Sequence, residues 1–260
     1  MTESVLRAQD GAILTLTLNR PQARNSLTIE MKEALLAALS GAAAADETRA
    51  VVITGAGEAF CAGQDLREHA GLLESGTGPG GTVRDHYNAI ALAVMTMGKP
   101  VIAAVNGSAA GAGASLALAC DFRLAARRAS FLMAFARVGL GPDTGASWTL
   151  QRLIGAGRAA EMMLLAEPVR AEDAPPGRLT AVVADDDRAG AAAALARRLA
   201  DGPTAAYAGI KAALAYAACH DLASSLEYEA VTQERLGATA DHRAATAAFV
   251  RKEPPRYTGR

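Results

Sequence analysis

The stretch from Lys99 to Asp143 constrains the fold of this chain more than any other. It begins with an apolar, β-branched run at 101–105, VIAAV, and then breaks at 106–113 into NGSAAGAG. A segment rich in alanine and leucine follows directly. Apolar runs that end at small residues are typical of buried strands, and the Ala/Leu-rich segment favours a helix. The sequence therefore predicts a buried strand, a tight turn and a helix N-terminus in direct succession.

The turn leaves its backbone open to a ligand. Gly111, Ala112 and Gly113 have almost no side chain, and the first N–H groups of a helix have no acceptor within it. The helix dipole adds roughly half a positive charge at the same end. An anionic oxygen held about 2.7–3.1 Å from such donors would sit in an oxyanion hole. The alternative is that these small residues only let the helix pack closely against its strand.

Composition argues against several classes of protein. The chain has 260 residues, 51% hydrophobic and 20% charged, which is typical of one large globular domain or a core with a small appendage. A net charge of −1 without a long basic run argues against nucleic acid and anionic membrane as partners. Without a membrane-spanning run or a signal-peptide pattern, the sequence predicts a cytoplasmic protein. The widely spaced Cys61, Cys120 and Cys219 favour reduced packing residues over disulfides or a metal site.

Strand and helix signals alternate along the first half of the chain. Residues 5–18 predict a hairpin, because Asp10-Gly11 is a strong turn dipeptide and leucine alternates with threonine after it. Thr28 is a candidate N-cap for a helix, and residues 50–54 predict a buried strand. This alternation favours crossover connections and mainly parallel strands. We therefore expect an α/β fold.

A second loop of small residues, Glu58–Leu66, follows the strand at 50–54 and leads toward a helical segment. It offers a second set of available N–H groups. The glycine-rich residues 71–82 predict a mobile loop. Short strands are expected at 122–125, 129–133 and 180–183, and helices at 83–97, 147–154, 159–165, 188–200, 204–217, 222–236 and 242–251. We expect a core at 1–200 and a helical C-terminal region at 201–260.

Four groups of residues occur in a fixed order along nearly the whole chain. They are NRP at 19–21 with RNSLT at 24–28, FCAGQDL at 60–66, KPV at 99–101 with NGSAAGAG at 106–113, and VGLGPD at 138–143. In this order and spacing they resemble the crotonase (enoyl-CoA hydratase/isomerase) superfamily. The resemblance implies a core that is a spiral of ββα turns and a C-terminal region that packs on neighbouring subunits in trimers or hexamers. It also implies acyl-CoA thioester substrates and no metal or redox cofactor, since coenzyme A is part of the substrate.

The resemblance also implies roles for particular residues. The thioester oxygen would lie between the backbone N–H groups of Gln64 and Ala112. Coenzyme A and the acyl group would lie along residues from both loops and the C-terminus, namely Ala23, Arg24, Ala62, Gly63, Asp65, Leu66, Gly111, Phe135 and Lys252, with Phe249 nearby.

The catalytic groups of this chain depart from those of the classical hydratases. The two glutamates of those enzymes fall at Ser115 and Phe135, which cannot hold and activate water as a carboxylate pair does. Asp143 matches the aspartate that serves as a base in crotonase-type isomerases. Without the resemblance, Asp143 is better interpreted as an N-cap of the helix that follows. The histidines His69, His220 and His242 are interpreted as solvated or structural.

Within the superfamily the sequence is most similar to the phenylacetate-pathway isomerases, which convert ring-epoxidised phenylacetyl-CoA to an oxepin thioester. The similarity lies in Gln64, Tyr87-Asn88, 131–135, Pro142-Asp143 and 255–259. We therefore expect an acyl-CoA isomerase, acting on such an epoxide or on a Δ3-Δ2-enoyl-CoA. An enoyl-CoA hydratase that works through another group or bound water, and a non-catalytic acyl-CoA-binding subunit, are the alternatives.

Overall fold

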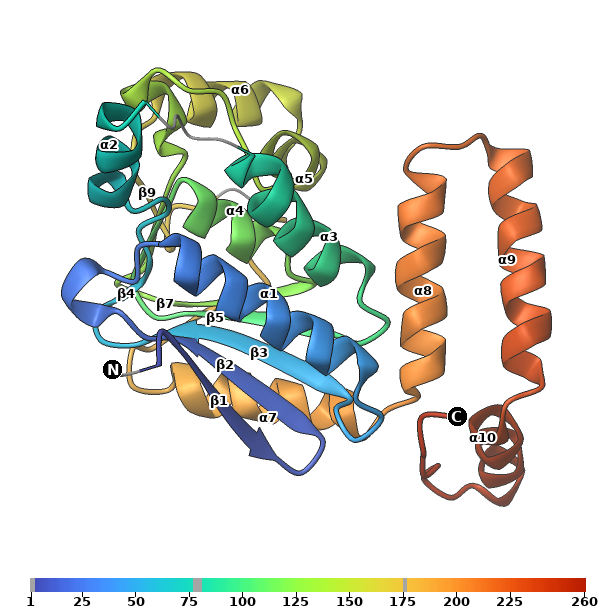
Figure 1. The fold of residues 1–260 in the computed structure, drawn as a ribbon. Helices are drawn as coiled ribbons and strands as arrows, with labels where there is room; N and C mark the ends of the chain where they lie inside the picture. The colour runs from blue at the N-terminus through green and yellow to red at the C-terminus, as the bar shows by residue number, and fades with distance from the viewer. Residues whose placement is uncertain (1–2, 77–80, 175–176) are drawn as a thin grey trace.

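The computed structural model describes residues 3–76, 81–174 and 177–260 (Figure 1). Its larger sheet has six strands in the order β1-β2-β3-β5-β7-β10. They are β1 Val5–Asp10, β2 Ile13–Leu18, β3 Ala50–Gly55, β5 Val101–Val105, β7 Phe122–Ala126 and β10 Ala181–Val183. The β1–β2 pair is the predicted antiparallel hairpin, and each later neighbouring pair is parallel. The expected mainly parallel α/β architecture is confirmed.

A smaller sheet has four strands in the order β4-β6-β8-β9. They are β4 Ala59–Cys61, β6 Ser108–Ala110, β8 Ser130–Leu132 and β9 Val169–Arg170. Along the chain, β3 is followed by β4 and helix α2 (Leu66–Glu74), and β5 is followed by β6 and helix α4 (Ala112–Ala119). Each turn of the chain adds a strand to each sheet and then a helix, which is the predicted spiral of ββα units.

Helices cover both faces of the larger sheet. They include α1 (Ile29–Ala44) and α3 (Ala89–Thr96) on one face and α7 (Arg188–Ala200) on the other. Successive residues of a strand point to opposite faces, so Val51 and Ile53 pack in the core with α1, whereas Val52 packs with α7. Thr28 begins α1 as predicted, with its hydroxyl accepting a hydrogen bond from the N–H of Met31 at 3.3 Å.

Five further helices belong to the core in the described part of the chain. They are the 3₁₀ helices η1 (Pro21–Ala23) and η3 (Ala134–Val138), the π-helix η2 (Val83–Asn88), α5 (Ala146–Ile154) and α6 (Ala156–Leu165). Because η2 continues directly into α3, the helix predicted at 83–97 is confirmed with a π-helical first part.

Three C-terminal helices form an arm beside the two sheets (Figure 1). They are α8 (Thr204–Ala217), α9 (Leu222–Gly237) and α10 (Ala240–Arg251). Helix α8 is attached to the core through Lys211, whose Nζ donates to Asp121 Oδ2 at 2.6 Å. The chain end folds back onto α10, where the carboxylate of Asp241 accepts hydrogen bonds from the N–H groups of Thr258 (2.7 Å) and Gly259 (2.8 Å).

Some local predictions are wrong. The predicted turn at 106–113 contains strand β6, and strands β4 and β9 have no clear sequence signal, because two or three residues are too few for an alternating pattern. The loop predicted at 71–82 is wrong at its start, since α2 continues to Glu74; residues 77–80 of that loop lie outside the described residues. Cys61 and Cys120 are buried as expected, but Cys219 is exposed and does not pack in a core.

Candidate active site

Two loops leave the smaller sheet side by side. Strands β4 and β6 are parallel, with Cys61 opposite Ala109, so both loops emerge at the same edge. Gly63 permits their close approach, because a Cβ there would lie 2.7 Å from the carbonyl oxygen of Ala110 and 3.3 Å from the nitrogen of Ala112. The φ of Gly63 is +85°, a conformation that side chains rarely adopt.

Each loop has one backbone N–H group that its local hydrogen bonding leaves available. Gln64 forms an isolated parallel bridge with Leu27. In this bridge Leu27 N–H donates to Gly63 at 2.7 Å and Asp65 N–H donates to Leu27 at 3.1 Å. Because adjacent N–H groups alternate in direction along an extended segment, that of Gln64 points away from Leu27. Ala112 is the first residue of α4, so its N–H has no acceptor inside the helix.

These two loops form part of the wall of a cavity of about 390 Å³. The loops contribute Ala62, Gln64, Gly111 and Ala112. The cavity has an apolar lining that includes Leu66, Leu73, Phe135, Val138 and Leu140. Its titratable lining residues are Asp143 and His69. A volume of this size suits a small acyl group, and an apolar wall strengthens hydrogen bonds to a developing negative charge.

Asp143 places a carboxylate in the wall of this cavity. Helix α5 begins at Ala146 with Gly145 as N-cap and no side-chain capping bond, so the interpretation of Asp143 as an N-cap is wrong. Its Oδ1 instead accepts a hydrogen bond from the hydroxyl of Thr144 at 2.8 Å. Burial raises the pKa of Asp143, against the opposing effects of the Thr144 hydroxyl and the charge of Lys32. A raised pKa makes this carboxylate a stronger base than an exposed one.

The positions of the two hydratase glutamates hold no carboxylate. Ser115 is fully buried, and its hydroxyl donates to the carbonyl oxygen of Gly111 at 3.0 Å within α4. Phe135 lies in the cavity wall. Among the described residues, the cavity wall therefore has one carboxylate to move protons rather than a pair to activate water.

A second hollow adjoins the cavity at Leu66, which lines both. This hollow has a volume of about 310 Å³ and includes three other residues expected to contact coenzyme A, namely Ala23, Arg24 and Asp65. Its further arginines are Arg20 and Arg67. A long thioester could thus extend from the cavity past Leu66 into a hollow rich in positive charge.

The side chain of Asp65 is already engaged within the protein. It forms an ion pair with Arg20 at 2.9 Å and caps α2 by accepting from the N–H groups of Arg67 and Glu68. Although burial raises its pKa, hydrogen bonds from Arg20, the Glu68 N–H and Ser26 hold the pKa at about 2. Asp65 therefore holds the Gln64 loop in place, which differs from the direct substrate contact expected from the sequence.

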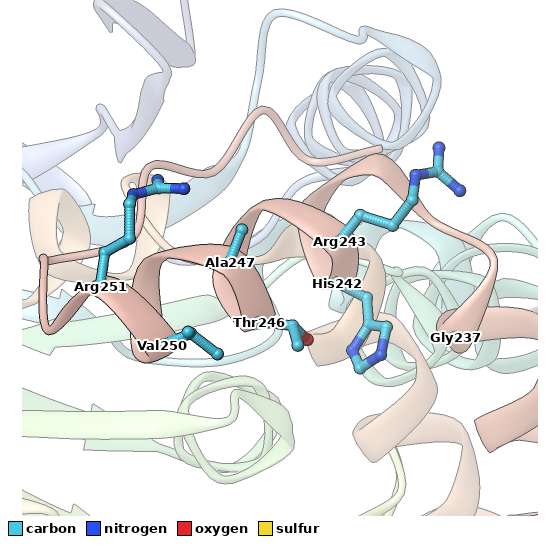
Figure 2. Close-up of a pocket in the computed structure, with 7 residues that line it drawn as sticks. All are labelled: Gly237, His242, Arg243, Thr246, Ala247, Val250 and Arg251. Atoms are coloured by element: carbon cyan, nitrogen blue, oxygen red, sulfur yellow. The ribbon is translucent and has the colours of Figure 1, made fainter.

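The structure does not bring Lys252 to the cavity. It ends α10 and is exposed, and α10 lies on the opposite side of the molecule from α2 (Figure 1). Figure 2 shows a separate hollow of about 600 Å³ along α10, which includes His242, Arg243 and Val250. None of its lining residues is one of the predicted site residues, and it has no carboxylate. We place the chemistry in the cavity of Asp143.

Sequence analysis missed several residues of the cavity. His69 is a residue of the cavity wall, whereas the sequence assigned it no role in the site and left it as solvated or structural. A signal was present, because Leu66, His69 and Leu73 recur at helical spacing in α2 and share one helix face. Val138 and Leu140 flank Gly139, a few residues before Asp143, and have no such periodic signal.

The family model described as enoyl-CoA hydratase/isomerase matches residues 8–260. The chain is 41% identical over 263 residues to the 1,2-epoxyphenylacetyl-CoA isomerase of Escherichia coli, with 100% of each chain covered. It is 44% identical over 252 residues to a probable enoyl-CoA hydratase of Rhodobacter capsulatus, with 95% of each covered. Among solved structures, a putative enoyl-CoA hydratase/isomerase from Mycobacterium abscessus superimposes with a TM-score of 0.94 at 42% identity, over 98% of this chain and 100% of the other.

Proposed function

Because the chain belongs to the enoyl-CoA hydratase/isomerase family, we propose that it is an acyl-CoA isomerase that shifts a proton through a thioester enolate. The observation that carries this proposal is the single carboxylate, Asp143, in a cavity shared with the available N–H groups of Gln64 and Ala112. The positions of the two hydratase glutamates are Ser115 and Phe135, and this absence favours proton transfer over hydration.

In the proposed reaction the thioester oxygen accepts hydrogen bonds from Gln64 and Ala112. The Asp143 carboxylate takes a proton from a substrate carbon, and the electrons of that C–H bond form the enolate double bond while negative charge develops on the thioester oxygen. The two N–H groups and the N-terminus of α4 stabilise that charge. Asp143 then returns the proton to a different carbon, so the product is an isomer of the substrate.

The second part of the proposal concerns the substrate. Phe135 and the apolar wall suit an aromatic or alkenyl acyl group, and the hollow with Ala23 and Arg24 suits the coenzyme A portion. The similarity to a protein named 1,2-epoxyphenylacetyl-CoA isomerase supports a ring-epoxidised phenylacetyl-CoA as the first substrate to test. A Δ3-enoyl-CoA is the second, and neither reaction needs a metal or redox cofactor.

His69 favours enoyl-CoA hydratase as a second candidate function. It lines the same cavity as Asp143, so these two side chains offer a different acid/base pair for water addition. The Rhodobacter capsulatus relative named as a probable enoyl-CoA hydratase is consistent with this candidate.

The deciding experiment compares wild type and Asp143→Asn with ring-epoxidised phenylacetyl-CoA, Δ3-enoyl-CoA and crotonyl-CoA. We expect isomerisation by the wild type, and a loss of at least about 10²-fold in the variant, in kcat more than in KM, because only the base is removed. Exchange of substrate protons with heavy water should stop in the variant as well.

Two results would contradict the isomerase proposal. Hydration of crotonyl-CoA by the wild type on the order of 10²–10³ per second would identify an efficient hydratase, and His69→Gln would then test the second candidate. Binding of coenzyme A esters without turnover of any substrate would identify a non-catalytic subunit.

A further inference from the structure

A buried lysine lies behind the Gln64 loop. Lys32 belongs to α1, and its side chain is 0% exposed. A buried ammonium is rare and needs partners. Its Nζ donates to Gln64 Oε1 at 3.2 Å and to the hydroxyl of Thr82 at 2.7 Å, and it lies 4.9 Å from the centre of the Tyr87 ring. The reaction proposed above gives this side chain no role.

Tyr87, on η2, contacts the same oxygen atom of Gln64 as Lys32 does. Its hydroxyl donates to Gln64 Oε1, the atom that also accepts from Lys32. Burial raises the pKa of Tyr87 well above its usual range, so the hydroxyl remains a neutral donor. The side chain of Gln64 is thereby held from α1 and η2 together, while its backbone N–H points away from Leu27. Holding this side chain also fixes the direction of that N–H group.

The ammonium also acts on the carboxylate of the cavity. Burial lowers the pKa of Lys32, and the charges of Glu68, Asp143 and Glu33 oppose that effect. In return the charge of Lys32 opposes the effect of burial on the pKa of Asp143.

Several other titratable groups surround this pair. Glu33 lies beside Lys32 on α1, and Glu68 on α2 accepts a hydrogen bond from the N–H of Ile29 at the start of α1. The Nδ1 of His86 on η2 is 3.1 Å from the Thr82 hydroxyl, and its Nε2 is 3.9 Å from Glu33. His69 lines the same cavity as Asp143.

We infer that Lys32 is a positioning residue of the active site: its buried ammonium fixes the Gln64 side chain, and its positive charge favours the carboxylate form of Asp143. The role of Lys32 in catalysis rests on the proposed function, whereas its effect on the titration of Asp143 can be measured without turnover. Asp143 abstracts a proton only as a carboxylate, and the burial that makes it a strong base also favours its protonated form. Lys32 offsets part of that effect without contacting the substrate.

The test measures the titration of Asp143 in the purified, ligand-free protein. Carbon-13 NMR of aspartate carboxyl groups, with Asp143→Asn to assign the signal, gives the pKa in wild type, Lys32→Met and Lys32→Gln. Methionine removes both the charge and the hydrogen bonds, whereas glutamine removes the charge and keeps a donor for Gln64. Lys99→Met is the matched control, since Lys99 is also partly buried and its Nζ donates to the carbonyl oxygens of Ala42 and Ala45 at the far end of α1.

Both Lys32 variants are expected to raise the pKa of Asp143 by about half a unit or more, and Lys99→Met to leave it unchanged. The acid limb of kcat/KM against pH should shift upward by the same amount. A folded Lys32→Met or Lys32→Gln protein in which Asp143 titrates as in wild type would overturn the inference. Because the titration needs no substrate, its result is separate from that of the isomerase proposal, which the turnover assays described above decide.

Discussion

Asp143 is a carboxylate in a site that favours its protonated form. Because burial raises its pKa in the folded chain, its contribution to stability is complete below the ordinary carboxyl pKa and is lost as the pH rises through the folded pKa. We therefore expect Asp143→Asn to melt at a higher temperature than wild type at pH 7, with the difference shrinking at about pH 3. Calorimetry at both pH values measures this, and a lower melting temperature for the variant at pH 7 would contradict it.

The pKa of Asp65 is lowered in the folded chain, whereas that of Asp143 is raised. Its pKa of about 2 means that it stabilises the folded chain above the ordinary carboxyl pKa, and that this contribution is lost as the pH falls through about 2. We expect Asp65→Asn to lower the free energy of unfolding at pH 7 by about 1–3 kcal/mol, because Arg20 loses its buried partner. In the control, Asp10→Asn breaks the exposed Arg197–Asp10 pair and should have an effect near zero. Equal effects in urea denaturation would refute the structural role given to Asp65.

For single residues, the sequence predicts those that act through the backbone better than those whose side chains make long-range contacts. Gln64 and Ala112 were expected from the resemblance to the crotonase superfamily, and the small residues next to both strand ends agree with that expectation; the structure brings both residues to the cavity wall. The interpretation of Asp65 as a substrate contact could not foresee Arg20, because that ion pair joins residues 45 positions apart. Lys32 was equally hidden, since a lysine within a helix usually faces solvent.

At the level of secondary structure, the loops after β4 and β6 lie close together, and the spacing of the N–H groups of Gln64 and Ala112 depends on this close approach. A Cβ at residue 63 would press on Ala110 at 2.7 Å, so Gly63→Ala should push apart the N–H groups of Gln64 and Ala112. We expect kcat to fall at least about 10-fold, since misplacement by about 1 Å can cost 10²-fold. Gly11→Ala is the control, because Gly11 also has a positive φ (+55°) but nothing within 4 Å of its Cβ position. Equal activity losses in the two variants would show that the close approach is unimportant.

Sequence patterns predict the longer elements well because each has a complete period. The helix that begins at Thr28 places Met31, Leu35 and Leu39 on one buried face, and the buried strands of the larger sheet are continuous apolar runs. The smaller sheet has strands of two or three residues, whose pairing depends on the larger sheet next to them. The sequence therefore predicts the layers of this fold. It does not predict the short strands of the smaller sheet, whose ends carry the loops that line the cavity.

In the whole molecule, the arm of α8, α9 and α10 has few attachments to the sheets. Lys211 joins α8 to Asp121, and Arg49 donates to Thr204 at 2.9 Å and to the carbonyl oxygen of Tyr257 at 3.1 Å. The arm carries exposed apolar side chains at helical spacing, with Ile210 and Leu214 on α8 and Leu222 and Leu226 on α9.

These apolar faces lead to a prediction about assembly. Leu214 is 70% exposed and Leu222 is 75% exposed, and adjacent exposed apolar side chains of this size mark surfaces that bind another protein. The resemblance to the crotonase superfamily implies trimers or hexamers, which are closed and symmetric assemblies, so we expect light scattering to give about three or six times the chain mass of 26.6 kDa. Leu214→Glu should shift the mass toward the monomer, whereas Leu6→Glu in the β1 hairpin should not. A monomeric wild type at micromolar concentration would leave these faces without the partner that their burial requires, and the assembly prediction would be wrong.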